Sequence, residues 1–104
     1  MIYIKIHYTE SSTIVAMCDE SLINSILEEG DIYIDIKMYA DFYKGDLVDS
    51  KKVSSMLENI KIGSANIIGK ESIDTAINLK LIEEDNIKYV NKIPYAHSYY
   101  IKYA

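Results

Sequence analysis

The sequence predicts a single α+β domain over residues 1–104, built from a mixed or antiparallel β-sheet with about three helices packed on one face. Three observations predict this class. Segments that alternate apolar and polar residues are interspersed with segments whose apolar residues recur at helical spacing. The length of 104 residues is close to the commonest domain size, and no linker-like stretch divides it. A hydrophobic fraction of 49% is ordinary for a globular protein.

The first two elements are predicted to form a β-hairpin. Ile2, Ile4 and Ile6 alternate with polar or aromatic residues, which is the period of a half-buried strand. Residues 9–12 are a polar turn, and residues 13–18 are apolar and rich in β-branched side chains. Two antiparallel strands joined by a short loop are therefore expected.

A helix is predicted next, between Asp19 and Gly30. Asp19 is a favoured N-cap residue and Gly30 a favoured residue just past a helix end. The apolar residues between them fall at helical spacing: Leu22, Ile23, Ile26 and Leu27. Residues 31–37 alternate again and predict a strand, and residues 38–43 are expected to extend it past a bend or to form another strand.

The second half of the chain is predicted to contain two helices around a buried strand. Asp49 or Ser50 can cap a helix that runs to about residue 59. Residues 64–69 are small and then apolar, which favours a short buried strand or a tight connection. Residues 71–80 carry apolar side chains in helical register and predict the third helix.

The tail is expected to be extended and rich in tyrosine. Strands are predicted at residues 87–90 and 98–103, on either side of Pro94. Neighbouring strand residues point to opposite faces, so Tyr99 and Tyr100 cannot both be buried on one side. The chain holds 10 Tyr, a residue enriched in protein interfaces, although the rings can equally cover an exposed sheet face.

Charge and composition narrow the partners. The formal net charge is −5, and all 11 basic side chains are Lys. Arg is the preferred residue for bidentate contacts to phosphate and guanine, so its absence argues against direct duplex binding. The apolar runs are far shorter than the roughly 20 residues of a membrane span, and Cys18 is the only cysteine. We therefore expect a cytoplasmic protein with no membrane contact and no cofactor.

One segment invites comparison with a phosphate-binding loop. Gly63 and Gly69 are followed by Lys70, but five residues lie between the two glycines where the motif needs four. Glu71 also occupies the position of the magnesium-binding hydroxyl, where a carboxylate would repel phosphate. Gly69 is instead expected to end a strand and turn the chain into a helix.

Cys18 with His7 and His97 is the only set of residues that suggests thiol or metal chemistry. Asp19 and Glu20 lie beside Cys18, and their charge would raise the pKa of the thiol. The sequence has no close-spaced Cys or His pair of the kind that zinc sites use, and its paired carboxylates lie at expected helix ends and turns. No catalytic residue or metal site is therefore predicted. A small thiol- or acid–base-dependent enzyme using Cys18 and a His stays open as an alternative.

Four short motifs, in this order and spacing, resemble the small archaeal family known as domain of unknown function 424. They are residues 18–20 before a helix, residues 42–45 at a turn, residues 65–69 before another helix, and a Pro-plus-His segment near the end. The resemblance spans nearly the whole chain. It implies a two-layer α/β sandwich and an association with archaeal translation and ribosome-related genes, and it brings no established activity.

The resemblance departs from the family in the tail. The family places a His beside the Pro, whereas Tyr95 and Ala96 separate Pro94 from His97 here, so no function of that His is carried over. Asn66 is either a functional polar residue or, as we favour, an amide that ties two strands together through backbone hydrogen bonds.

These observations together predict a non-catalytic accessory or binding module. The expected partner is a protein or ribonucleoprotein, with a translation or ribosome association implied by the resemblance. A homo-oligomeric structural or interaction protein is a further alternative. The candidate binding residues are Phe42, Tyr43, Lys44, Gly45, Asn66, Gly69 and His97.

Overall fold

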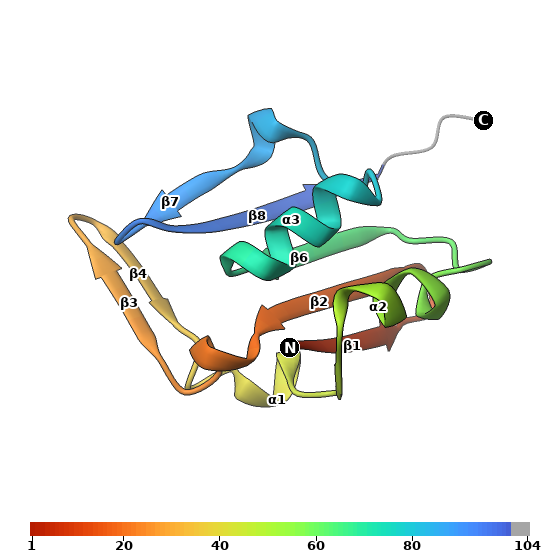
Figure 1. Cartoon of the computed structure of the whole chain (residues 1–104), viewed down its shortest axis with the longest axis horizontal. Helices are drawn as coiled ribbons and strands as arrows, with labels where there is room; N and C mark the ends of the chain where they lie inside the picture. Colours follow the sequence, from red (N-terminus) through yellow and green to blue (C-terminus); the bar gives the residue numbers. More distant parts are fainter. Residues whose placement is uncertain (101–104) are drawn as a thin grey trace.

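The computed structural model describes residues 1–100, which form a six-stranded sheet, a two-stranded sheet and three α-helices (Figure 1). This confirms the predicted α+β class. The six strands lie in the order β5-β1-β2-β6-β8-β7. Their bounds are β1 Ile2–Tyr8, β2 Thr13–Asp19, β5 Asp46–Val48, β6 Ser64–Ile68, β7 Lys88–Val90 and β8 Ile93–Tyr99. The other elements are β3 Ile26–Glu29, β4 Ile32–Asp35, α1 Ala40–Tyr43, α2 Ser50–Met56, α3 Lys70–Asn78 and the 3₁₀ turns η1 Glu20–Leu22 and η2 Glu84–Asn86.

The sheet is antiparallel except at its centre. β1 and β2 form the predicted hairpin, and β2 pairs in parallel with β6. A parallel pair cannot be joined by a tight turn, so the chain between β2 and β6 makes a long excursion. That excursion holds β3, β4, α1, β5 and α2, and it carries the chain across both faces of the sheet.

One face of the sheet is sealed by α2 and α3. Ile4, Met17 and Ile67 point to this face from three adjacent strands and are at most 1% exposed. Val53 of α2 and Ile73 of α3 complete the same cluster. α2 begins where predicted, because the Asp49 carboxylate accepts a hydrogen bond from the Lys52 amide at 2.8 Å, but it ends at Met56.

The opposite face is covered only in part. α1 packs here, with Ala40 and Tyr43 against Cys18 and Ile68. Two helices therefore lie on one face and the third on the other, which differs from the predicted arrangement of three helices on one face. The sequence prediction missed α1 and assigned residues 38–43 to a strand, because a helix of four residues without a side-chain cap leaves little local signal.

The predicted helix between Asp19 and Gly30 is wrong. Only the single turn η1 forms, after which β3 and β4 make a second hairpin around Gly30. Gly30 has a φ of +58°, which suits a tight hairpin turn as well as a helix end. The amides of Ile36 and Lys37 donate to the Ser25 carbonyl oxygen at 3.0 and 3.1 Å and close the base of this hairpin, a contact that helical spacing cannot reveal.

Asp19 does cap a helix, but that helix is α3. Its Oδ1 accepts from the Ser72 amide and hydroxyl, both at 2.8 Å, and its Oδ2 accepts from the Glu71 amide at 3.2 Å. Gly69 leaves β6 with a φ of +108°, and a Cβ there would overlap the Asp19 carboxyl group. The end of β2 is thus tied to the start of α3 across the parallel strand pair.

The tail contains the two predicted strands with shifted bounds. β8 begins at Ile93 and runs through Pro94 to Tyr99, so the strand predicted at residues 98–103 lies partly outside the described residues. Tyr99 is exposed and Tyr100 is packed against the helix-side core, as their alternation predicts. β5 was not predicted.

Candidate functional site

The open face of the sheet is the part that α2 and α3 do not cover, and its floor is built by strand register. Asn66 on β6 lies between Ala16 on β2 and His97 on β8. All three residues point away from the helix-side core, because their neighbours Met17, Ile67 and Ala96 fill that core. The floor at this point is therefore one amide among small and aromatic side chains.

α1 forms an aromatic wall beside this floor. The Phe42 ring stacks on the His7 imidazole with centroids 4.6 Å apart and planes 13° from parallel. The Tyr43 ring meets Phe42 edge-on at 5.1 Å. The His7 Nε2 also makes a 2.8 Å hydrogen bond to the Phe42 carbonyl oxygen. The wall is thus fixed to β1 through both a ring contact and a polar contact.

The wall and the floor enclose a cavity of about 360 Å³. Its lining is mainly apolar and aromatic, and consists of Ile34, Asp35, Ile36, Tyr39, Phe42, Tyr43 and Asn66. Burial raises the pKa of the Tyr43 hydroxyl to about 12, so this ring is neutral at ordinary pH. We call this cavity the open-face pocket.

Asn66 is the polar group at the floor of the open-face pocket. Within residues 1–100 its side-chain amide makes no hydrogen bond, so the favoured role of tying two strands together is not seen. An amide offers both a donor and an acceptor, and in an apolar setting it gains from a ligand that satisfies both.

Exposed aromatic and sulfur-containing side chains lie on or beside the open face. Tyr39 is 61% exposed, Tyr99 69% and Met38 73%. The centroids of the His97 and Tyr99 rings are 4.4 Å apart. Tyr and Met are enriched in protein interfaces relative to the rest of a protein surface, so this composition is typical of a recognition surface.

The structure brings most of the predicted binding residues to this face. Phe42, Tyr43 and Asn66 line the open-face pocket, and His97 pairs with Asn66 on the next strand. The remaining predicted residues are Lys44, Gly45 and Gly69. Sequence reasoning missed Ile34, Ile36 and Tyr39, because it did not predict that residues 34–43 fold back over the sheet.

Lys44 and Gly45 flank the wall. The Lys44 ammonium lies 6.0 Å from the centre of the Tyr3 ring, and Gly45 packs so closely on the Ile4 backbone and Lys5 that a Cβ would clash. Gly69 is elsewhere: it lies between β6 and α3 and has a structural role beside the Asp19 cap.

Cys18 is not arranged as a nucleophile. Its side chain is fully buried, and its thiol donates a hydrogen bond to the Asp19 carbonyl oxygen at 3.4 Å. Burial raises the pKa of Cys18 to about 12, and the Asp19 charge acts in the same direction. Cys18 pairs with Tyr3, whereas His7 pairs with Ile14 at the other end of the hairpin. Neither imidazole is bonded to the thiol within residues 1–100.

The segment around Gly69 does not offer its amides to a phosphate. The first amides of α3, from Glu71 and Ser72, donate to the Asp19 carboxylate. This agrees with the sequence interpretation that Gly69 ends a strand. Across residues 1–100, no group of three or more His, Cys, Asp or Glu side chains is placed to hold a metal ion.

Binding a single strand of nucleic acid would need several lysines gathered on one face, but the four lysines of residues 51–70 are spread over the helix side and one end of the sheet. Lys51 and Lys52 lie on α2, and Lys70 on α3 pairs with Asp74 at 3.1 Å. Lys61 precedes β6 and so lies near the end of that strand opposite to Lys70. None of them lines the open-face pocket. In the part of the chain that is described, no helix has the length and hydropathy needed to cross a membrane.

Comparison with known proteins identifies the family and supports the fold. No curated protein sequence matches the chain. The structure is similar to the crystal structure of an uncharacterized conserved protein from Methanopyrus kandleri, with a TM-score of 0.75 and 22% sequence identity over 94% of this chain and 90% of that chain. At this identity the likeness shows a shared fold. The family model described as "Protein of unknown function (DUF424)" matches residues 6–101, and the chain therefore belongs to that family.

Proposed function

We propose that this protein is a non-catalytic binding module that uses the open face of its sheet to hold a partner protein. The observation that carries the proposal is the open-face pocket, in which the Asn66 amide, which makes no hydrogen bond within residues 1–100, lies at the floor of an aromatic and aliphatic cavity. A side chain of the partner would fill the cavity. The partner's main chain supplies the N–H and C=O groups that the Asn66 amide needs.

The charge around the pocket favours a protein over a phosphate-rich partner. Asp35 lines the cavity, and Asp41 lies on the α1 wall. The two lysines beside the wall are already engaged, because the Lys5 ammonium donates to the Asp41 carbonyl oxygen at 2.7 Å and the Lys44 ammonium lies over the Tyr3 ring. The whole chain carries a formal charge of −5. A nucleic acid gains much of its binding free energy from phosphate neutralisation by basic residues, and this face offers little of it. Exposed Tyr and Met side chains instead supply large apolar contact area.

The buried thiol supports a binding role over the enzyme alternative. A thiol-dependent enzyme needs Cys18 ionised and in reach of an imidazole, whereas burial raises its pKa and its hydrogen bond goes to a backbone oxygen. Association with translation or with the ribosome is the finer part of the proposal. It follows from the family resemblance, and the identity of the captured partner decides it.

Affinity capture from an extract of the source organism tests the module. The test variant is the double change Tyr39→Ala, Tyr99→Ala, because both rings are exposed and their loss leaves the core intact. Tyr8→Ala is the matched control, because Tyr8 is 71% exposed at the far end of β1 and does not line the pocket. Wild type and the Tyr8→Ala control should retain the same proteins, and the double variant should retain at least about tenfold less.

Three results would contradict the proposal. If all three baits retain the same proteins, the open face is not the binding surface. If none retains anything, a stable partner does not exist under those conditions and the module role fails. If the retained proteins include no ribosomal protein or translation factor, the module stands and the translation association fails.

The homo-oligomer alternative is tested separately. A second copy could cover the same exposed rings, since Tyr39 and Tyr99 are available for an isologous contact. Light scattering from about 0.1 to 10 mg/mL should show a monomer if the surface is reserved for another protein. A dimer that Tyr39→Ala, Tyr99→Ala dissociates would assign the open face to self-association.

A further inference from the structure

The helix layer of the sheet is incomplete over one edge. α3 contacts β2, β6 and β8, and α2 lies beside it toward β1. The β7–β8 hairpin extends beyond α3, and among residues 1–100 only the short turn η2 covers it on that side (Figure 1). A sheet of this width leaves room for one more helix beside α3.

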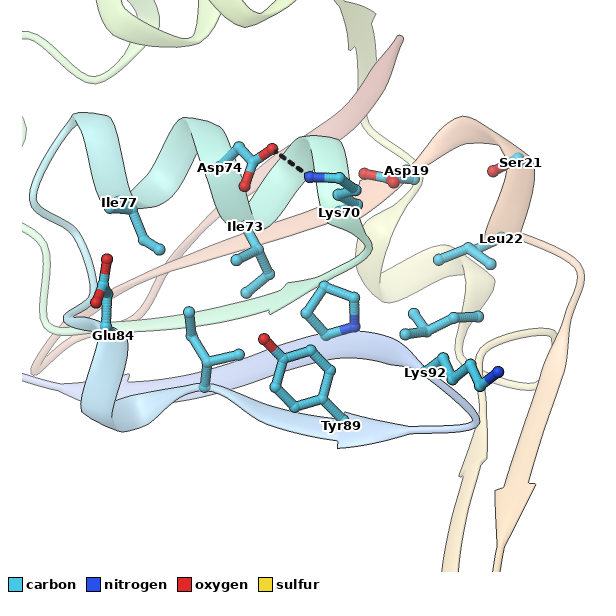
Figure 2. Close-up of a pocket in the computed structure, with 13 residues that line it drawn as sticks. Asp19, Ser21, Leu22, Lys70, Ile73, Asp74, Ile77, Glu84, Tyr89 and Lys92 are labelled. Carbon is cyan, nitrogen blue, oxygen red and sulfur yellow. Dashed lines mark hydrogen bonds and ion pairs between the residues drawn. The ribbon is translucent and has the colours of Figure 1, made fainter.

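A groove with a volume of about 800 Å³ lies at this position, between α3 and the β7–β8 hairpin (Figure 2). We call it the α3 groove. α3 contributes Lys70, Ile73, Asp74 and Ile77, which are spaced i, i+3, i+4 and i+7 along one helix flank. This is the stripe that a helix presents to a neighbouring helix.

The floor of the α3 groove is aliphatic. Ile73 and Ile77 point from α3 toward the hairpin, and the Tyr89 ring points from β7 toward them (Figure 2). Ile73 belongs to the helix-side core and is 3% exposed, so it closes the bottom of the groove, while Ile77 is half-buried at its side. Ile87, Ile93 and Pro94 complete this surface and are half-buried, while Tyr89 is 60% exposed at the rim. A small polar ligand needs several convergent polar groups. Of the polar groups along the groove, Lys70 and Asp74 pair with each other, and Asp19 is bonded to the first amides of α3. An apolar stripe with a polar rim matches a protein interface instead.

The free charges at the two ends of the α3 groove are opposite. Lys92 lies at the end near the start of α3, and Glu84 lies at the other end beside Ile77 (Figure 2). Neither forms an ion pair within residues 1–100, whereas Lys70 is paired with Asp74 midway. The Asp19 carboxylate also lines the end near the start of α3, but it accepts three hydrogen bonds from Glu71 and Ser72. The eight residues from Lys70 to Ile77 rise about 10 Å, so about two turns of a bound helix match this length of α3.

We propose that the α3 groove binds an amphipathic helix of a partner protein, with an apolar stripe facing Ile73 and Ile77, an acidic residue at the Lys92 end and a basic residue at the Glu84 end. The bound helix completes the layer that α2 and α3 begin. Packing of the stripe supplies the affinity, and the charged ends supply the selection between helices. This surface is separate from the open-face pocket, which lies on the other side of the sheet.

The test uses stapled helical peptides of about eleven residues, because unstapled peptides of this length are scarcely helical. All carry the same Leu stripe at i, i+3, i+4 and i+7. One has an acidic and a basic end, one has two basic ends, and one has two acidic ends. The full chain is labelled at its Ile methyl groups and titrated with each peptide by NMR.

The peptide with mixed ends should shift the methyl signals of the groove residues Ile73, Ile77, Ile87 and Ile93. It should leave Ile34 and Ile36, which line the open-face pocket, unshifted. It should bind about three- to tenfold more tightly than the two like-charged peptides, the range that exposed ion pairs allow. Tyr89→Ala should weaken it at least about fivefold.

A charge reversal sharpens the test. Glu84→Lys makes both ends basic and should move the preference to the peptide with two acidic ends. Glu58→Lys is the matched control, because Glu58 is exposed and does not line the groove, and it should leave the order of affinities unchanged. Both positions are on the surface, so neither change threatens folding.

Four outcomes would overturn the proposal. The first is that the peptide shifts the methyl signals of Ile34 and Ile36 in place of the groove methyls, and the second is that no signal shifts up to about 1 mM peptide. The third is that Glu84→Lys leaves the order of affinities unchanged. The fourth is that the groove signals shift when the protein alone is concentrated. The last outcome would assign the groove to a second copy of this chain. Only the first outcome concerns the open-face pocket, and it would move the peptide to that pocket. The other three leave the open-face module untouched.

Discussion

On the helix-covered face of the sheet, β1, β2 and β6 contribute aliphatic side chains that α2 and α3 bury, and Met17 and Ile67 are at most 1% exposed. On the open face, the neighbouring strand residues are Ala16, Asn66 and His97, and aromatic rings from α1 lie beside them. The two faces are formed by the same strands. Substitutions on the covered face should therefore change mainly stability, and substitutions on the open face should change mainly binding.

The difference shows where this fold leaves freedom for function. A sealed aliphatic face tolerates few changes, because every buried side chain has neighbours that depend on its volume. The open face keeps its shape through a few contacts, such as the stack of Phe42 on His7, and can vary its exposed rings without touching the core. Two neighbours on β6, Ile67 and Asn66, make this contrast measurable.

The largest effect is expected for Ile67→Ala. Ile67 is 1% exposed in the helix-side core, so its truncation should lower the free energy of unfolding by about 2–5 kcal/mol. Asn66→Ala, one residue away on the open face, should change it by less than about 0.5 kcal/mol. Urea unfolding followed by circular dichroism measures both. Equal losses for the two variants would show that the open face is as integral to the core as the covered one.

Gly69→Ala should have the next largest effect. Gly69 has a φ of +108° and faces the Asp19 carboxyl group, so a Cβ would both strain the backbone and displace the α3 cap. We expect a loss of about 2–3 kcal/mol in the free energy of unfolding. Gly30→Ala is the control, because Gly30 also has a positive φ but nothing lies within 4 Å of an added Cβ. A loss at Gly69 no greater than at Gly30 would contradict the role of the Asp19 contact.

Alkaline pH should weaken the buried contacts of the open face. The pKa of Cys18 is raised from 9.0 to about 12 in the folded chain, mainly by burial, so the unfolded chain loses this proton first as the pH rises. Stability is full below pH 9 and declines toward pH 12, by about 1 kcal/mol over the first pH unit. Cys18→Ala should flatten the decline only in part, because burial also raises the pKa of Tyr43 to about 12.

Urea midpoints at pH 8, 9 and 10 for wild type and Cys18→Ala measure this decline. A thiol reagent at pH 8 provides a second readout, since Cys18 should react only as fast as the native chain opens. Rapid labelling of the native protein, or equal declines for the two chains, would mean that the thiol ionises normally. The thiol-enzyme alternative would then regain its chemical basis.

The sequence predicted the elements whose local pattern has one interpretation. Ile2, Ile4 and Ile6 alternate strictly, and no other element fits them. Asp49 caps α2 because its carboxylate reaches an amide three residues on, a contact that depends only on local geometry. The α+β class follows from such elements together.

The prediction failed where two interpretations share the same residues. Leu22, Ile23, Ile26 and Leu27 have helical spacing, and Gly30 suits a helix end and a hairpin turn equally. The choice is made at a distance, by the Ser25 carbonyl oxygen that accepts from two amides at the end of the β3–β4 hairpin. Local propensity cannot report such a contact.

The candidate sites follow the same rule. Asn66 and Phe42 were identified from the sequence as separate candidates, but their meeting in one cavity depends on α1 folding back over the sheet. The α3 groove was not predicted at all, because a missing helix beside α3 leaves no mark in the sequence. The sequence shows which residue types are present at each site, but it does not show which of them lie side by side in the fold.

The smallest effect is expected at the rim of the α3 groove. The ion pair between Lys70 and Asp74 joins side chains that are 81% and 60% exposed, so solvent screens most of its attraction. Lys70→Ala should change the free energy of unfolding by less than about 0.5 kcal/mol, and added salt should remove even that. Differential scanning calorimetry at low and high salt measures it. A loss above about 1 kcal/mol would mean that this rim contributes to the folded core and is not a free surface that a partner can use.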